Sequence, residues 1–159
     1  MKPNRLTRLV QRLQPYPVWV RSWMVGRAVK FTGTAGIQYT VMTHEKVVVH
    51  LSNKPKVRNH IGQIHAAAMV LLAETATGMA LGMHIPDDKI PLIKRIEADF
   101  VKRSQGAMQA EAWLTNEQIQ ALHEEERGAL NIAVSITDAS GEAPIKTTMQ
   151  WAWVPKKRT

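Results

Sequence analysis

The sequence contains no cysteine among its 159 residues. It therefore has no disulfide, no thiolate nucleophile, no thiolate-bound metal and no thiol redox chemistry. Long apolar runs are also absent, because the longest one covers only residues 66–73, whereas a membrane-spanning helix needs about 20 residues. Pro15 and Pro17 interrupt the basic N-terminal segment before any signal-peptide core. We therefore expect no signal peptide, no transmembrane segment and a cytoplasmic protein.

Acidic residues are missing from residues 1–30, which hold seven of the 21 lysines and arginines. The other 129 residues carry 14 basic and 13 acidic side chains, so nearly all of the net charge of +8 lies in this N-terminal segment. A nucleic-acid-binding domain more often spreads a basic face over its fold, so we expect no nucleic-acid partner. Trp19 and Trp23 accompany these basic residues, and the combination suits a membrane surface. Packing on the rest of the protein is the other interpretation.

The composition, with 45% hydrophobic and 21% charged residues, predicts one globular domain. We expect a basic helical arm over residues 1–33 and a domain over residues 34–159. Within the arm, apolar residues recur at helical spacing over residues 4–14, where Asn4 can cap the helix. A second helix is expected over residues 18–30.

We expect the helical arm to be interrupted at Gly33 and Gly36, and the residues after this break have the patterns of β-strands. Residues 37–42 and 46–51 are rich in β-branched side chains and predict a hairpin. Further segments predict four strands, mostly by alternation of apolar and polar residues, and one short surface helix. These strands are 92–102, 107–114, 130–137 and 145–154, and the helix is 116–126.

Residues 64–83 predict a helix of about five turns that is small or apolar on every side. Such a helix must be buried in a soluble protein. In a chain of this length the simplest way to bury it is to wrap a sheet around it. The sequence therefore predicts an α+β architecture in which an antiparallel sheet of about six strands surrounds one long helix.

Glu74 is the only acidic residue of this helix. A buried glutamate is rare unless it is paired, and desolvation raises its pKa toward the range of a general base. The alternative is a glutamate at an exposed edge or in a salt bridge. Thr77, one turn further on, either bonds this carboxylate or a bound water, or bonds its own helix backbone.

The helix start offers a second chemical group. Gly62 allows a tight turn before His65, and the first N–H groups of a helix lack internal partners and can polarise a carbonyl. His65 and Glu74 are nine residues apart, which places them about 13–14 Å apart on opposite sides of the helix. A two-fold dimer can bring the start of one helix to Glu74 of the other. We therefore expect a homodimer, or a tetramer, with shared sites.

Residues 59–78, N-H-I-G-Q-I-H-A-A-A-M-V-L-L-A-E-T-A-T-G, resemble the signature of hotdog-fold acyl-CoA thioesterases of the hydroxybenzoyl-CoA and phenylacetate pathways. The segment looks closer still to a bacterial branch with His-Ala in place of His-Gly-Gly. The order of strands is similar too, so the resemblance covers residues 35–155. It implies a hotdog fold and hydrolysis of acyl-CoA. It also implies no metal and no cofactor, with coenzyme A present only as part of the substrate.

The same resemblance implies residue roles. Glu74 matches the carboxylate that acts as base or nucleophile, Asn59 matches the amide that holds the thioester or the water, and His65 lies by the thioester oxygen. Ala66 and Ala67 replace the glycine pair whose backbone N–H polarises the carbonyl, and alanine keeps that N–H. The substrate-binding residues expected beside them are Gly62, Thr77 and Gly78.

Three other functions fit parts of the sequence. A non-catalytic acyl or lipid binder would use the same pocket, and the Ala66-Ala67 pair favours it. A hotdog dehydratase also pairs a histidine with a helix carboxylate, but its usual Pro-Gly before the helix is missing. A regulator with a DNA-binding arm would need a recognition helix that the arm lacks. For a thioesterase, Glu74 either activates water or forms an anhydride with the acyl group.

Overall fold

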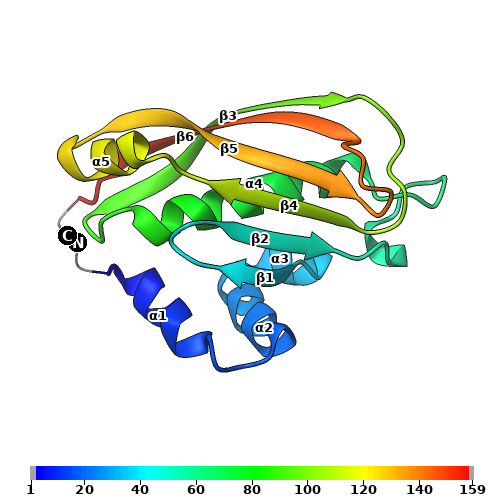
Figure 1. Ribbon diagram of the computed structural model, residues 1–159, viewed down its shortest axis with the longest axis horizontal. Helices are drawn as coiled ribbons and strands as arrows, with labels where there is room; N and C mark the ends of the chain where they lie inside the picture. Colours follow the sequence, from blue (N-terminus) through cyan, green and yellow to red (C-terminus); the bar gives the residue numbers. More distant parts are fainter. Residues whose placement is uncertain (1–2, 158–159) are drawn as a thin grey trace.

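The computed structural model describes residues 3–157. Three helices come first and are followed by a hairpin, a long helix and four further strands with one short helix between them (Figure 1). The helices are α1 (Arg5–Leu13), α2 (Val18–Ala28), α3 (Lys30–Ala35), the 3-10 turn η1 (Pro55–Val57), α4 (Ala66–His84) and α5 (Asn116–Glu124). The strands are β1 (Gln38–Met42), β2 (Val47–Leu51), β3 (Lys89–Phe100), β4 (Met108–Trp113), β5 (Gly128–Asp138) and β6 (Ile145–Pro155).

The strands form one six-stranded sheet in the order β1-β2-β4-β5-β6-β3, with antiparallel neighbours throughout. The sheet curves around α4, as Figure 1 shows. Its inner side chains include those that the alternation in the sequence predicted. Met149, Trp151 and Trp153 of β6 are buried, as are Met108 and Ala110 of β4. The predicted α+β architecture is confirmed.

Helix α4 is the core helix of the domain. It is long and apolar enough to span a bilayer, but it packs against five of the six strands and contacts α1 and α3. The expectation that it is buried on every side is wrong, because the sheet covers only one side of it. Ala66 and Ala67 are exposed, and the side of α4 that carries Glu74 is only partly covered.

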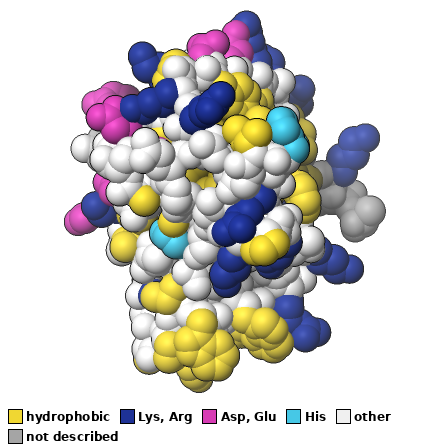
Figure 2. Space-filling model, turned by 90° about the vertical axis from the view of Figure 1, so that its right-hand side faces the viewer, with side chains coloured by type: hydrophobic (Ala, Val, Ile, Leu, Met, Phe, Trp, Pro, Cys, Tyr) yellow, Lys and Arg dark blue, Asp and Glu magenta, His cyan; other side chains and the backbone are white. Residues whose placement is uncertain are grey.

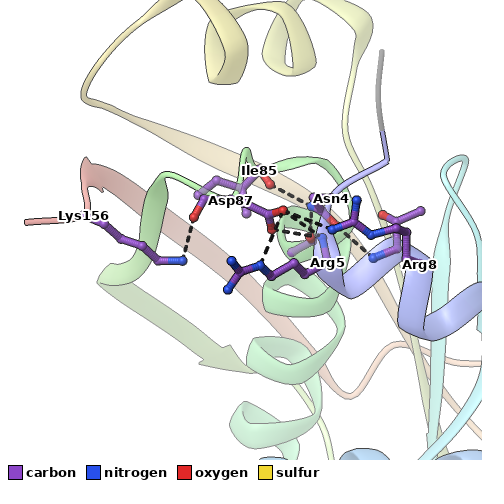
Figure 3. A network of polar contacts seen from close by, with 8 residues as sticks. Asn4, Arg5, Arg8, Ile85, Asp87 and Lys156 are labelled. Atoms are coloured by element: carbon purple, nitrogen blue, oxygen red, sulfur yellow. Dashed lines mark hydrogen bonds and ion pairs between the residues drawn. The ribbon is translucent and has the colours of Figure 1, made fainter. Parts of the chain in front are cut away.

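The arm is docked on the domain through both ends of its first helix. The Asn4 side chain accepts a hydrogen bond from the Thr7 N–H, as the predicted cap, and donates to the carbonyls of Gly82 and Ile85 at the end of α4. The Asp87 carboxylate accepts from the Arg5 N–H (Figure 3). Further along α1, the apolar residues Val10 and Leu13 are buried. The N-terminal helix is therefore part of the packed structure.

The break expected at Gly33 is wrong, because α3 runs through this residue to Ala35, with Gly36 as its C-cap at a φ of +79°. The role of Gly33 is instead to allow close packing of two helices. A Cβ atom there would lie 2.7 Å from the Gly26 carbonyl oxygen. The two glycines thus allow the backbones of α2 and α3 to touch.

The two edges of the sheet differ. The β1 edge is covered by α2, because Ser22 Oγ accepts a hydrogen bond from the Tyr39 N–H and Arg21 donates to the Thr40 carbonyl. Within residues 3–157, β3 pairs only with β6, so its outer edge is open. Large apolar side chains of β3 are exposed on both faces, namely Ile90, Leu92, Ile93, Ile96 and Phe100. The open, apolar edge of this twelve-residue strand can pair with a further strand.

Candidate functional site

The turn that leads into α4 is organised by Asn59. Its Oδ1 atom accepts hydrogen bonds from the N–H groups of Ile61 and Gln63, each at 3.1 Å. Gly62 in this turn has a φ of +79°, a conformation that favours glycine. The Asn59 carboxamide thus uses its oxygen for the turn, and its NH₂ group has no hydrogen-bond partner among residues 3–157.

His65 is the N-cap of α4, and its Nδ1 atom accepts a hydrogen bond from the Ala67 N–H at 3.0 Å. This bond requires an Nδ1 without a proton, so the neutral imidazole carries its hydrogen on Nε2. The Ala66 N–H has no hydrogen-bond partner among the described residues. It is also at the positive end of the α4 dipole. Of the two alanine N–H groups, only that of Ala66 is left to polarise a carbonyl.

Glu74 is half-buried on α4, and its carboxylate has no hydrogen bond or ion pair within the described part of the chain. Burial raises the pKa of its carboxyl group above the ordinary value of 4.5. The alternative of a salt-bridged Glu74 therefore does not apply to this protomer. A partly desolvated carboxylate without a partner can take a proton from water.

Glu74 lines an apolar pocket of about 340 Å³. The arm forms one wall of this pocket with Leu6, Leu9 and Leu13 of α1 and with residues of α2 and α3. The opposite wall comes from α4, β1, β3 and β6. A carboxylate in a mostly apolar cavity is the arrangement expected where a polar centre reacts at the end of a hydrophobic ligand. The sequence did not reveal that the arm encloses this space.

Thr77 and Gly78 position a tryptophan beside Glu74. The fully buried Thr77 hydroxyl donates to the Ala73 carbonyl and accepts from Trp151 Nε1–H at 3.0 Å. A Cβ atom on Gly78 would lie 2.8 Å from the Trp151 ring, so glycine makes room for it. The structure therefore places Thr77 against its own backbone and Trp151, and Gly78 in the pocket lining.

Two pocket residues were missed by the sequence analysis. Thr75, next to Glu74, is buried in the pocket lining, and its Oγ1 atom has no partner among the described residues. Tyr39 of β1 also lines the pocket, and burial together with the nearby Glu74 raises its pKa. Thr75 was detectable as a second polar residue in an apolar helix. Tyr39 was not, because its position depends on how β1 packs.

The predicted site residues form two groups on one protomer. Asn59, Gly62 and the residues from His65 to Ala67 lie at the start of α4, and Glu74 and Gly78 lie two to three turns further along it. Ala66 and Glu74 are eight residues apart on α4, so helical rise separates them by roughly 12 Å. One protomer therefore does not place the Ala66 N–H and the Glu74 carboxylate on the same small group.

Solved structures with the same arrangement come from several bacteria. A Pseudomonas aeruginosa protein described as a probable thioesterase has a TM-score of 0.77 and 20% identity, over 89% of this chain and 97% of that one. A Haemophilus influenzae thioesterase has a TM-score of 0.68 and 14% identity, over 90% of this chain and 94% of that one. A Staphylococcus aureus thioesterase has a TM-score of 0.64 and 18% identity, over 79% and 99%. At these identities the likeness concerns the fold, and the predicted hotdog fold is confirmed.

Among curated proteins, none matches the chain significantly. A family match does cover residues 18–154, from the start of α2 to the end of the sheet. It includes α2 and α3 as well as the whole segment from Asn59 to Gly78. The chain with this half-buried glutamate and helix-start site belongs to the family described as a domain of unknown function, DUF4442.

Proposed function

We propose that the protein is an acyl-CoA thioesterase that uses Glu74 as its base. The observation that carries the proposal is the position of Glu74, which is half-buried at an apolar pocket, has no partner among the described residues and has a raised pKa. The apolar pocket suits a medium-to-long or aromatic acyl group. The thioesterase descriptions of proteins with the same fold support the reaction class.

The chemistry follows from these groups. The Glu74 carboxylate takes a proton from a water molecule while the water oxygen forms a bond to the thioester carbon. The carbonyl oxygen gains the negative charge and accepts a hydrogen bond from the Ala66 N–H at the helix start. The carbon–sulfur bond then breaks as the carbonyl reforms, and the proton held by Glu74 passes to the leaving thiolate. The products are a carboxylic acid and the free thiol of coenzyme A.

The site requires two protomers in this proposal. The Ala66 N–H and Glu74 of one chain are separated along α4, so the N–H comes from the partner's helix. The open apolar edge of β3 is the surface that supports such a homodimer, since the β1 edge is already covered by α2. A tetramer would combine two such dimers.

A spacing in one relative supports the choice of residues. The Staphylococcus aureus protein has been solved with a glutamine at its position 32, or a glutamate at its position 47, replaced by alanine. These two positions are fifteen apart, and Asn59 and Glu74 are fifteen apart in this chain. A side-chain amide and a glutamate at the same spacing were thus selected for replacement in a protein with the same fold, with glutamine there in place of asparagine here.

Thiol release from a panel of short, long and aromatic acyl-CoAs tests the proposal. We expect Glu74→Gln to lower kcat by about 10²–10⁴-fold, the usual contribution of a general base. Glu117→Gln is the matched control, because Glu117 is exposed on α5 and we expect this variant to keep wild-type activity. Wild-type activity in Glu74→Gln would refute the assignment of the base.

A proline at Ala66 tests the helix-start group. Ala66 is the first residue of α4, and proline is tolerated there but removes the N–H. We expect Ala66→Pro to fold and to lower kcat by about 10²–10³-fold. Mixing equal amounts of unfolded Ala66→Pro and Glu74→Gln chains and refolding them tests the shared site. Half of the refolded dimers then contain one chain of each variant, and one of their two sites combines the unchanged Ala66 of one chain with the unchanged Glu74 of the other. About a quarter of the wild-type activity should therefore return, whereas sites formed within single chains would give no activity.

The second candidate function is a non-catalytic acyl binder. The observation that favours it is Ala67, whose N–H is taken by His65, and whose methyl group stands with that of Ala66 at the exposed helix start. It predicts acyl-CoA binding without thiol release above background. Binding that Glu74→Gln and Ala66→Pro leave unchanged, with no release by the wild type, would replace the thioesterase by this function.

A further inference from the structure

Aromatic and cationic side chains share the outer surface of α2 and α3. Trp19, Trp23 and Phe31 are 69%, 59% and 66% exposed, although side chains of this kind are usually buried. Trp19, Trp23 and Arg27 follow each other at four-residue spacing and form one stripe along α2. The Arg27 guanidinium lies 5.1 Å from the Trp23 ring centre. We name Trp19, Trp23, Arg27, Lys30 and Phe31 the Trp–Arg face.

A groove of about 680 Å³ lies within this face. Its lining includes the two tryptophans together with Arg27, Lys30 and Lys54, and no acidic side chain is among its lining residues. Large hydrophobic side chains protrude at one end of the molecule, with lysines and arginines close to them (Figure 2). The first acidic residue of the chain is Glu45, so α1, α2 and α3 contain no negative charge. The positive charge of the face is therefore not neutralised by its own helices.

We propose that the Trp–Arg face docks on the surface of an anionic lipid bilayer. Tryptophan places its ring among lipid chains and its N–H among headgroups, which explains why these rings can be stable in an exposed position. Arginine and lysine beside them are attracted to the negative surface of the bilayer. The acid-free groove is complementary in charge to a lipid phosphate.

Helix α2 and the residues that follow it contribute to both this face and the pocket of Glu74. Met24 and Val29 line the pocket and are 39% and 50% exposed, and in the sequence they are next to Trp23 and Lys30. Docking through the Trp–Arg face therefore holds the helix that forms part of the pocket wall at the bilayer surface, where amphiphilic acyl compounds concentrate. The use of the pocket for such a substrate rests on the proposed function, whereas the docking itself does not.

Co-sedimentation with vesicles tests the docking without any substrate, so its result is independent of hydrolysis. We expect the wild type to bind vesicles of phosphatidylcholine with one-third phosphatidylglycerol, to bind less in 0.5 M salt, and to leave pure phosphatidylcholine vesicles unbound. Each cation at the surface contributes roughly fivefold to affinity, so Arg27→Gln with Lys30→Gln should weaken binding roughly 30-fold. Arg103→Gln with Arg127→Gln removes the same charge outside the arm, and we expect its affinity within about twofold of the wild type.

The tryptophans are tested by Trp19→Ser with Trp23→Ser. Both side chains are mostly exposed, so the circular dichroism of the variant should equal that of the wild type. We expect vesicles to shift the wild-type tryptophan emission to the blue and to leave the variant unshifted and unbound. Equal binding to neutral and anionic vesicles, or wild-type binding by either face variant, would overturn the proposal. Tighter binding to single-stranded DNA than to vesicles, lost in the Arg27 and Lys30 variant, would assign the face to nucleic acid instead.

Discussion

Replacement of Asn4 tests whether the arm is an integral part of the fold. In Asn4→Ala the cap of α1 is lost, which costs about 1 kcal/mol. The two bonds from Nδ2 to Gly82 and Ile85, at 2.8 and 2.7 Å, are lost as well, at about 0.5–1.5 kcal/mol each. The free energy of unfolding should therefore fall by about 2–4 kcal/mol, which for a chain of this size lowers Tm by roughly 4–16 °C.

Asn4→Asp separates the two roles of the side chain. Aspartate caps a helix as well as asparagine does, but it has no NH₂ group to donate to the carbonyls at the end of α4. Its charge would also face the negative end of the α4 dipole. We expect Asn4→Asp to lose about 2–3 kcal/mol despite the retained cap.

Urea unfolding followed by circular dichroism, at one protein concentration, measures these differences. Asn116→Ala is the control, because Asn116 is an exposed residue at the start of α5, and surface substitutions of this kind change stability by within about 0.5 kcal/mol. An Asn4→Ala variant as stable as Asn116→Ala would refute the docking of α1. Wild-type stability in Asn4→Asp would show that the bonds to α4 contribute nothing.

Three further predictions concern α4 around Glu74. Thr77→Val leaves the Trp151 N–H buried without its acceptor and should cost about 1–3 kcal/mol in urea unfolding. An equal loss in a Trp151→Phe background would contradict this cause. Gly78→Ala forces a methyl group against the Trp151 ring, which costs about 1–3 kcal/mol and outweighs the gain of about 1 kcal/mol in helix propensity. A more stable Gly78→Ala variant would show that the ring moves freely. The pKa of Glu74 is raised in the folded state, so its contribution to stability is full below its ordinary value of 4.5 and is lost as the pH rises through the folded-state pKa. Glu74→Gln should therefore be more stable than the wild type at pH 7 but not at pH 4, and urea curves at both pH values check this.

The fold was predictable where buried residues show in the sequence as a regular pattern of apolar side chains. The alternation around Met149, Trp151 and Trp153 identified β6, and the apolar composition of α4 identified the core helix. The packing of the arm was not predictable, because the pattern of residues 4–14 shows that one face is buried but not against what. Gly33 was misread for a related reason: a glycine that lets two helix backbones touch looks in the sequence like a glycine that ends a helix.

The candidate site was predictable only where a residue contrasts with its surroundings. Glu74 is a single acidic residue in an apolar helix, and this contrast predicted a raised pKa, which the structure bears out in direction. Thr75 gave a weaker contrast, because threonine in a helix usually bonds its own backbone. Tyr39 gave none, since its place in the pocket depends on how β1 packs against α2 and α3. The sharing of the site between two protomers stays a prediction.

The open edge of β3 has a consequence for how the protein is produced. Until another strand covers it, a newly folded protomer can pair through this edge with any exposed strand, and such pairing leads to aggregates. The strand also contains a protection, because its register shifts between Ile93 and Arg95, and Lys94 lies at this irregularity. A bulge and a lysine within an open edge both hinder the stacking of many copies. Slow synthesis at low temperature should accordingly improve the soluble yield, since aggregation increases steeply with the concentration of uncovered protomers.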